Sequence, residues 1–257
     1  MIVKTPKFIK DTIINMIQKG ATLLFFIFSL LYTNISIAQT DSLLLTKAIN
    51  NAKQVYYSGI GDQAAKFNGR QYQGYTESFA EGHPYYRSSF LTKGSIVYDG
   101  LKFDDLNLLY DEVRDCVVFQ DSTHRIQLVN EKLSEFNIEA SKFKRLVKKE
   151  GDAIIKTGFY QILSEGKATL YKKETKRIIE KINNTNDLLI YFEIQHNYYV
   201  LLNNKYLELK RKKDILALIQ GKEKQVIKLL SNAGIGFRKN KEGYLQFIVD
   251  YLNQRNQ

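Results

Sequence analysis

The first pattern with chemical potential is a group of five carboxylates between residues 104 and 115. Its members are Asp104, Asp105, Asp111, Glu112 and Asp115. Closely spaced carboxylates can perform acid–base catalysis or hold calcium. Aspartate is also common in turns and at strand ends, where its side chain bonds the local backbone. We therefore expect these residues to shape turns, and an envelope hydrolase that uses them is the alternative.

The three histidines, His83, His124 and His196, are widely separated in the sequence. Asp121 lies three residues before His124, and Glu193 lies three residues before His196. On a single strand, an odd spacing directs two side chains to opposite faces. The sequence therefore predicts no metal site. It also contains no phosphate loop, dinucleotide-binding fingerprint or nucleophile elbow, so no cofactor is expected.

Positive charge is concentrated in the second half of the chain. Residues 39–140 carry ten basic and fourteen acidic side chains, a net charge of −4, whereas residues 141–257 carry 24 basic and 12 acidic side chains, a net charge of +12. The densest basic run is Lys210-Arg211-Lys212-Lys213. Such a run is usually a solvated face that confers solubility, and a surface of four convergent cations that binds an anion is the alternative.

The carboxylates belong to residues 90–146, a segment typical of an antiparallel β-meander. Short apolar runs recur there about every ten residues, with polar turns such as Asp99-Gly100 between them. Consecutive strands usually pair with their neighbours in sequence. The predicted strands cover residues 95–98, 106–110, 116–119, 126–129, 136–138 and 143–146. Cys116, the only cysteine, lies in one of them and is expected to be buried rather than nucleophilic.

The second half of the chain continues this pattern before its period changes. Residues 158–163 and 168–171 predict a hairpin, and the polar residues 174–187 predict a surface loop or short helix. Residues 188–194, 199–202 and 206–209 predict strands, and Asn203-Asn204 suits the tight turn between the last two. Apolar residues at helical spacing then predict helices around residues 215–219, 226–230 and 244–252, the last of them capped by Asn240.

The N-terminal region predicts export. Residues 21–38 are the most apolar stretch, four lysines precede it, and Ser36-Ile37-Ala38 ends it with small residues. This arrangement predicts a signal peptide that is cleaved after Ala38, and a membrane anchor is the alternative. Met16 is an alternative start to Met1. Residues 41–57 then predict an amphipathic helix that Asp41 caps.

Several runs in the chain resemble uncharacterised exported β-rich proteins of Gram-negative bacteria. The runs cover residues 67–72, 83–86, 94–100, 108–111 and 237–240. This resemblance implies an envelope or secreted location and carries over no catalytic residue. A second resemblance, to half-barrel envelope carriers that hold lipid in a curved antiparallel sheet, rests on strand number and export alone.

Together these patterns predict an α+β protein: a large, curved, mostly antiparallel β-meander or half-barrel with an N-terminal helix and a C-terminal helical cap. The expected segments are a signal peptide (1–38), a helix and linker (39–66), a sheet domain (67–210) and helices packed on the sheet (211–257). We expect a periplasmic or secreted protein, with outer-membrane association an open possibility, that binds a ligand or partner without catalysis. An envelope protein, a lipid or an anionic glycan would be its partner. No nucleic acid partner is expected, and no transmembrane span after cleavage of the signal.

Overall fold

The structure is a computed structural model in which the chain divides into two compact units, residues 1–59 and residues 60–257. It describes residues 69–254, apart from 122–123, 152 and 183–187, together with isolated positions between 44 and 55. The predicted signal peptide, with its apolar stretch, lies outside the described residues. The described positions of the predicted helix at 41–57 are helical, and the rest of that prediction also lies outside.

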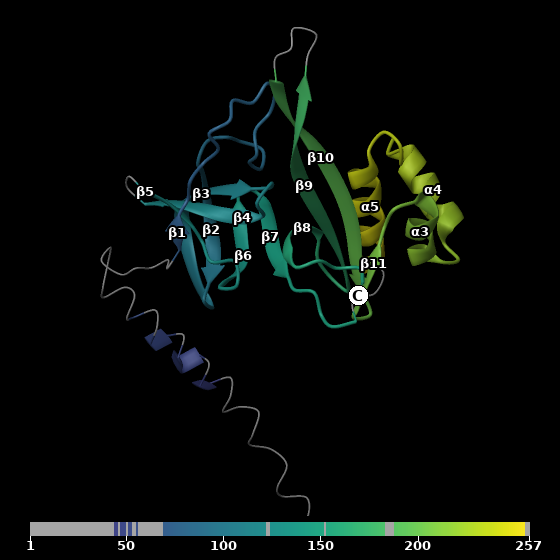
Figure 1. Cartoon of the computed structure of the whole chain (residues 1–257). Helices are drawn as coiled ribbons and strands as arrows, with labels where there is room; N and C mark the ends of the chain where they lie inside the picture. The colour runs from purple at the N-terminus through teal and green to yellow at the C-terminus, as the bar shows by residue number, and fades with distance from the viewer. Residues whose placement is uncertain are drawn as a thin grey trace, which may run out of the picture. The chain divides into compact units, whose positions relative to one another are not determined.

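In the part of the chain that the structure describes, eleven strands form one antiparallel sheet (Figure 1). The strands are β1 (Arg70–Gln71), β2 (Thr92–Tyr98), β3 (Leu101–Asp111), β4 (Cys116–Asp121), β5 (His124–Gln127), β6 (Leu133–Ile138), β7 (Ser141–Leu146), β8 (Gly158–Ser164), β9 (Ala168–Ile182), β10 (Leu188–Leu202) and β11 (Lys205–Glu208). Their order in the sheet is β1-β5-β4-β3-β2-β6-β7-β8-β9-β10-β11. The sheet is open, and the predicted fold class, α+β and mostly antiparallel β, is confirmed.

The pairing of neighbouring strands departs from the expected meander at one point. Strand β6 pairs with β2 instead of β5, so β3, β4 and β5 extend the sheet on the far side of β2. The expected tight turns are present, because Asp99 and Gly100 both have positive φ between β2 and β3, as do Asn203 and Asn204 between β10 and β11. Local turn chemistry therefore specifies the hairpins, and tertiary packing decides where β6 returns.

The predicted surface loop or short helix at 174–187 is wrong over the residues that the structure describes. Strand β9 continues through this polar segment to Ile182, and β10 begins at Leu188. The two strands pair along their whole lengths and form a ribbon that projects from the rest of the sheet (Figure 1). A polar composition favours a loop because polar side chains are usually solvated. Here Lys176, and Lys173 just before the segment, instead bind carboxylates of the β3–β4 turn that are distant in sequence.

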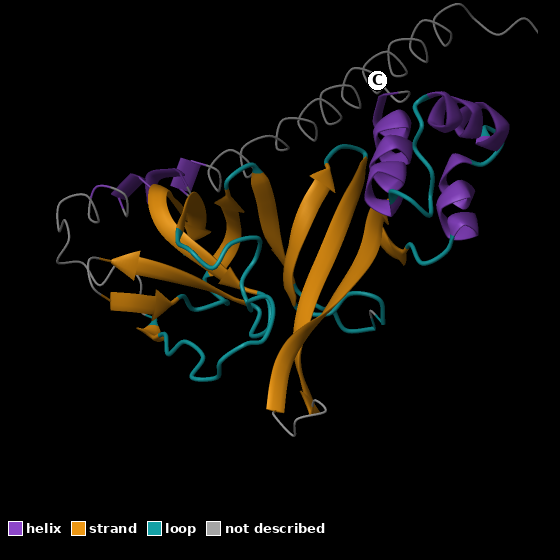
Figure 2. Ribbon diagram, turned by 90° about the horizontal axis from the view of Figure 1, so that it is seen from above, coloured by secondary structure: helices purple, strands orange, loops and turns teal. Residues whose placement is uncertain are grey.

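Helices follow the last strand and pack beside the long strands at one end of the sheet (Figure 2). They are α3 (Lys212–Leu216), the 3₁₀ turn η3 (Ala217–Ile219), α4 (Glu223–Asn232) and α5 (Lys241–Gln254). The Asn240 side chain accepts the Gly243 N–H at 2.8 Å, so the predicted cap of the last helix is confirmed. Apolar residues of these helices pack against Leu170 and Val200 of the long strands. Among the described helices, none has the length and apolar character to cross a bilayer.

A second core lies where aromatic residues of β3, β6, β7 and β8 meet. The rings of Phe136 and Phe143 are stacked with their centroids 4.5 Å apart. Tyr110 packs against both of these rings, and Phe159 packs against Phe136 and Tyr110. These rings form a packed aromatic core, and the resemblance to lipid carriers remains a prediction.

Cys116 lies at the start of β4 with none of its surface exposed, as expected. Burial raises the pKa of its thiol to about 12. Replacement by alanine should lower the free energy of unfolding by about 1 kcal/mol, because only a small buried group is lost. In the native protein, the thiol should react with a water-soluble maleimide far more slowly than an exposed thiol does. Labelling at the rate of an unfolded control would contradict this prediction.

Candidate functional site

The turn between β3 and β4 brings together three of the five carboxylates found in the sequence: Asp111, Glu112 and Asp115. The other two lie elsewhere on β3 and are exposed. There, Asp104 pairs with a lysine of its own strand, and Asp105 pairs with a lysine of β2. The sequence cluster is therefore two separate groups in the structure.

Asp111 is completely buried and accepts hydrogen bonds from four donors. Two are phenols: Tyr72 donates at 2.8 Å, and Tyr75 donates to both carboxylate oxygens at 2.9 and 3.0 Å. The other two are the backbone N–H groups of Val113 and Arg114, at 3.0 and 2.9 Å. Burial and the charge of Asp111 raise the pKa of both phenols, so they stay protonated and donate. This carboxylate organises the turn and the tyrosine-rich segment beside it.

Asp115 is bound by residues of β3 and β9. It accepts hydrogen bonds from Tyr110 and from Lys173 Nζ, both at 2.6 Å. Lys173 also donates to the Phe159 carbonyl at 2.9 Å, and burial lowers its pKa although Asp115 acts in the opposite direction. A Cβ on Gly158 would lie 2.3 Å from Asp115 Oδ2, so only glycine fits beside this pair. The pair fastens the turn to one side of β9.

Glu112 forms the most deeply buried ion pair of the turn. Its Oε2 lies 3.1 Å from Lys176 Nζ, and the carboxylate side chain has no exposed surface. Lys176 also donates to the carbonyls of His83 and Tyr85, at 3.1 and 2.5 Å. Neither carboxylate oxygen of Glu112 accepts a well-aligned hydrogen bond from a described residue. Burial, helped by the nearby charge of Glu174, raises the pKa of Glu112 to about 7.

The histidines do not complete a catalytic arrangement with this cluster. The Nδ1 of His83 is buried, and no described residue hydrogen-bonds to it. Burial and the Lys176 charge lower the pKa of His83, which keeps its ring neutral. His124 lies on β5, opposite Asp121 of β4. His196 Nε2 lies 3.0 Å from Glu174 of β9. The carboxylates of the turn are thus engaged by lysines, phenols and backbone groups.

Sequence reasoning missed the residues that give this cluster its chemistry. Lys176 falls in the segment 174–187 that was predicted to be a loop or short helix, and Lys173 directly precedes it. The sequence indicated no role for Tyr72 or Tyr75. The alternation of Lys172, Lys173, Glu174 and Lys176 is usually a solvated surface, so it gives no signal of burial. Only the meeting of β9 with the β3–β4 turn makes these lysines internal partners.

The second candidate site, the basic run at 210–213, lies at the predicted strand-to-helix junction: it follows β11, and Lys212 and Lys213 are the first two residues of α3. All four side chains are exposed. Two of them have acidic partners: Lys210 pairs with Glu208 at 3.0 Å, and Arg211 pairs with Asp214 at 3.2 Å. Lys212 lies over the ring of Tyr244 at 5.9 Å. Among the described residues, no carboxylate forms an ion pair with Lys212 or Lys213.

Lys241 extends this basic run from the start of α5. Its Nζ donates to the Lys210 carbonyl at 3.4 Å and lies 5.1 Å from the centroid of the Tyr198 ring. Burial lowers the pKa of Lys241. Residues 238 and 239, in the loop just before it, are also basic. We call Lys210, Arg211, Lys212, Lys213 and Lys241 the basic junction.

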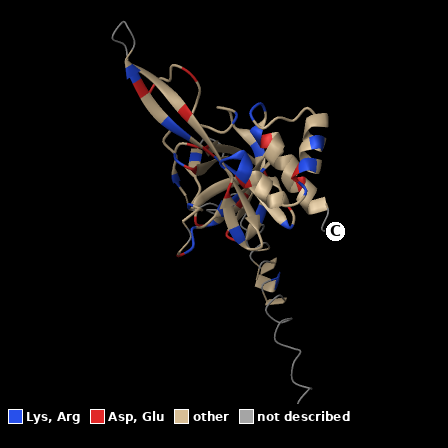
Figure 3. Cartoon of the chain, turned by 90° about the vertical axis from the view of Figure 1, so that its right-hand side faces the viewer, with Lys and Arg blue, Asp and Glu red and all other residues tan. Residues whose placement is uncertain are grey.

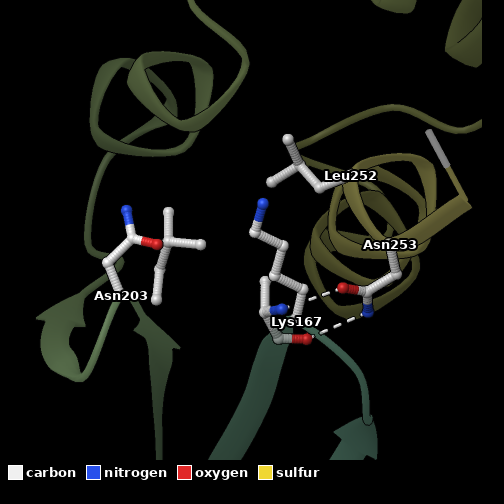
Figure 4. A pocket seen from close by; sticks show the side chains of 6 residues that line it. Lys167, Asn203, Leu252 and Asn253 are labelled. Carbon is white, nitrogen blue, oxygen red and sulfur yellow. Dashed lines mark hydrogen bonds between the residues drawn. The ribbon is translucent and has the colours of Figure 1, made fainter. Parts of the chain in front are cut away.

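A small pocket of about 130 Å³ lies between the β8–β9 turn, the β10–β11 turn and the end of α5 (Figure 4). Asn253 points into the β8–β9 turn, where its side chain accepts the Ala168 N–H and donates to the Ala168 carbonyl, both at 2.9 Å. The polar group beside the pocket is therefore used within the protein. The pocket is better explained by loose packing between two turns than by a ligand.

Neither metal coordination nor a known relative assigns a function to these sites. Within the described part of the chain, no three His, Cys, Asp or Glu side chains gather as a metal-binding group. Comparison with known proteins finds no matching family model, no matching curated protein and no matching solved structure. The resemblance to exported β-rich proteins therefore remains a prediction, and functional inference rests on the residues themselves.

Proposed function

We propose that this chain is an exported, non-catalytic envelope protein that binds an anionic partner through the basic junction. The observation that carries this proposal is the gathering of Lys210, Lys212, Lys213 and Lys241 at the end of the sheet. The contact between Lys241 Nζ and the Lys210 carbonyl joins the two segments. Cations that converge on a fixed scaffold attract phosphates and acidic surfaces, and the attraction weakens as salt screens it.

The state of the carboxylates supports binding over the alternative, an envelope hydrolase. A general acid or base needs an oxygen or nitrogen that can reach a substrate. The carboxylate oxygens of Asp111 and Asp115 instead accept hydrogen bonds from donors within the protein, and Glu112 is buried against Lys176. These contacts hold the β3–β4 turn against β9, which is a structural role.

Reversing the charge of Lys212 and Lys213 tests the proposal. These two lysines are chosen because Arg211 caps α3 through Asp214, so changing Arg211 would also disturb the helix. The wild-type protein should bind vesicles rich in phosphatidylglycerol at low salt and leave neutral vesicles unbound. The double variant Lys212→Glu/Lys213→Glu should bind at least about tenfold more weakly, since each lysine near such a surface contributes about 1 kcal/mol.

The matched control is Lys224→Glu/Lys228→Glu on α4, which changes the net charge by the same amount at two exposed positions. It should bind vesicles nearly as the wild type does. Purified lipopolysaccharide in place of vesicles separates a phosphorylated glycolipid from a phospholipid as the preferred anion. If the variant at Lys212 and Lys213 is folded and binds both probes as the wild type does, the basic junction is a solvated surface and the proposal is wrong.

A further inference from the structure

Three exposed arginines lie in the part of the sheet that ends at β1, at the other end from β11 (Figure 1). Arg70 belongs to β1, Arg125 belongs to β5, and Arg114 lies in the turn between β3 and β4. Residues 39–140 have a net charge of −4, so a group of positive charges is unexpected in this part of the chain. What the three side chains contact decides whether they are free to bind a ligand.

Strand pairing places these arginines on one face of the sheet, around Tyr72. Arg70 lies opposite Gln127 of β5. The Tyr72 N–H donates to the Arg125 carbonyl at 2.8 Å, so these two residues are also opposite each other. Alternate residues of a strand share a face, and diagonal neighbours such as Arg70 and Arg125 have Cβ atoms about 7 to 8 Å apart. The Arg114 guanidinium lies 5.4 Å from the centroid of the Tyr72 ring.

The buried Cys116 supports this placement. It belongs to the same small apolar core as Tyr72. Burial raises the pKa of the Cys116 thiol, and the charges of Arg114 and Arg70 both act in the opposite direction. The two arginines are therefore close to the same buried atom, although they are far apart in sequence.

Neutral side chains hold two of the arginines in place. Arg70 Nε donates to the side-chain oxygen of Gln127 at 3.1 Å. Arg125 Nε donates to the side-chain oxygen of Gln120, also at 3.1 Å. Among the residues that the structure describes, no carboxylate forms an ion pair with either arginine. Each guanidinium is thus oriented while its charge and its remaining N–H groups stay available.

Other exposed cations of the sheet have acidic partners. In the same half of the chain, the pairs are Arg87–Glu139, Lys93–Asp105 and Lys102–Asp104. In the ribbon of β9 and β10, Arg177 binds Glu193, and segments of both colours occur along it (Figure 3). Against this background, two exposed arginines that contact only glutamines favour a ligand that brings its own negative charge.

Arg114 connects the two arginines to a row of aromatic rings. Its guanidinium lies 4.2 Å from the centroid of the Tyr75 ring and donates to the Gln73 carbonyl at 2.6 Å. The Tyr75 and Phe79 ring centroids are 5.7 Å apart, and those of Phe79 and Phe192 are 4.7 Å apart. All three rings are half-buried, so part of each is accessible to a ligand. We call these three rings the aromatic strip.

We propose that this face binds an acidic oligosaccharide, whose acid groups contact Arg70 and Arg125 while its sugar rings pack on the aromatic strip. A guanidinium donates two parallel hydrogen bonds to a carboxylate or sulfate, which a lysine cannot do. The C–H face of a sugar ring is apolar and packs against aromatic rings. A bare anion would use the arginines alone, so the combination favours a sugar acid. The proposal does not rest on the basic junction, which lies at the other end of the sheet.

Isothermal titration calorimetry with trigalacturonate tests this proposal at about 0.15 M salt, where long-range attraction is largely screened. The wild type should bind trigalacturonate at least about tenfold more tightly than the neutral trisaccharide maltotriose. Arg70→Ala/Arg125→Ala should lower the affinity at least about tenfold, because it removes two charged groups of donors. Arg70→Lys/Arg125→Lys should also bind more weakly, since lysine keeps the charge but not the paired donors.

The matched control is Lys93→Ala/Lys102→Ala, which removes two exposed positive charges from the same half of the chain. It should bind trigalacturonate as the wild type does. Sulfated maltotriose in place of trigalacturonate separates a sulfate from a carboxylate as the preferred acid group. Citrate carries three carboxylates without sugar rings, and it should bind more weakly than trigalacturonate because it cannot use the aromatic strip.

Three outcomes would overturn the proposal. A folded Arg70→Ala/Arg125→Ala variant that binds both acidic sugars as the wild type does would show that the arginines are only solvated. A wild type that binds neither acidic sugar more tightly than maltotriose would show that no such site exists. Citrate binding as tight as that of trigalacturonate would show a site for small anions only.

The same variants separate this site from the basic junction. Lys212→Glu/Lys213→Glu should keep the wild-type affinity for trigalacturonate, and Arg70→Ala/Arg125→Ala should keep the wild-type binding of vesicles. Failure of the saccharide site and failure of the anion-binding proposal are therefore distinguishable.

Discussion

Replacing Asp111 by alanine is expected to lower the free energy of unfolding by about 3 to 5 kcal/mol, the range typical of breaking a buried charged group away from its partners. The substitution leaves two phenols and two backbone N–H groups without their acceptor. Each buried polar group without a partner costs about 1 to 3 kcal/mol, although water can reach some of them after the change.

Urea denaturation followed by circular dichroism measures this loss, with Asp104→Ala as the matched control. Asp104 is exposed and pairs only with a lysine at the surface, so its replacement should change stability by less than about 0.5 kcal/mol. Asp111→Asn keeps one oxygen as an acceptor and should give an intermediate loss. If Asp111→Ala unfolds at the same urea concentration as Asp104→Ala, the carboxylate does not organise the turn.

Replacing Lys176 by methionine should have an effect of similar size, about 3 to 5 kcal/mol near pH 8. Methionine preserves the packing volume but leaves the carboxylate of Glu112 buried without its cation, and it leaves the His83 and Tyr85 carbonyls without their donor. The double variant Glu112→Gln/Lys176→Met should recover a large part of the loss, because no buried charge remains. A double variant that is as unstable as Lys176→Met would show that the ion pair is not the cause.

The pH dependence follows from the raised pKa of Glu112. The folded protein binds this proton with a pKa of about 7, whereas the usual value for the unfolded chain is 4.5. Between these values the folded state holds more protons than the unfolded state, so stability falls as pH rises from 4.5 to 7. At about 1.4 kcal/mol per pKa unit, the full contribution is roughly 3 kcal/mol. Lys172, Lys173, Glu174 and Lys176 are charged groups that interact with Glu112.

Measuring unfolding at several pH values separates this contribution from the rest of the protein. The stability of wild type relative to Glu112→Gln should decrease between pH 4.5 and 7 and then level off. The loss in Lys176→Met should likewise shrink as pH falls, because protonation neutralises Glu112. A difference between wild type and Glu112→Gln that stays constant across this range would contradict the raised pKa.

Much of the sheet and the C-terminal helices could be predicted because their signals are local. Period-two alternation of apolar residues marks half-buried strands. Tight turns require positive φ, which Asp99-Gly100 and Asn203-Asn204 adopt. The Asn240 side chain caps the helix that begins just after it. Each of these effects acts between residues that are close in sequence. They predicted the presence of most strands and helices and the place of the basic run at a strand-to-helix junction, but not the bounds of the long strands: β3 begins at Leu101, and the strands predicted at 188–194 and 199–202 are the single strand β10.

The path of β6 and the length of β9 could not be predicted in this way. Strand β6 pairs with β2 and not with β5, the strand before it in sequence. This position places Phe136 of β6 against Phe143 and Phe159 in the aromatic core. The polar part of β9 is stable as a strand because it pairs with β10 and because its lysines bind the β3–β4 turn. Composition alone favours a loop there, since it does not include these distant partners.

By itself, the sequence determined the secondary-structure class, the tight turns, the helix cap and the burial of Cys116, because short-range sterics, hydrogen bonding and side-chain period decide such features. Only the tertiary structure decided that Asp111, Glu112 and Asp115 are internal partners of tyrosines and lysines rather than a catalytic group. Lys173 reaches Asp115 across 58 residues of chain. Periodicity reports which face of a strand is apolar, but it contains no information about which charged groups meet when the sheet curls and excludes water from between them.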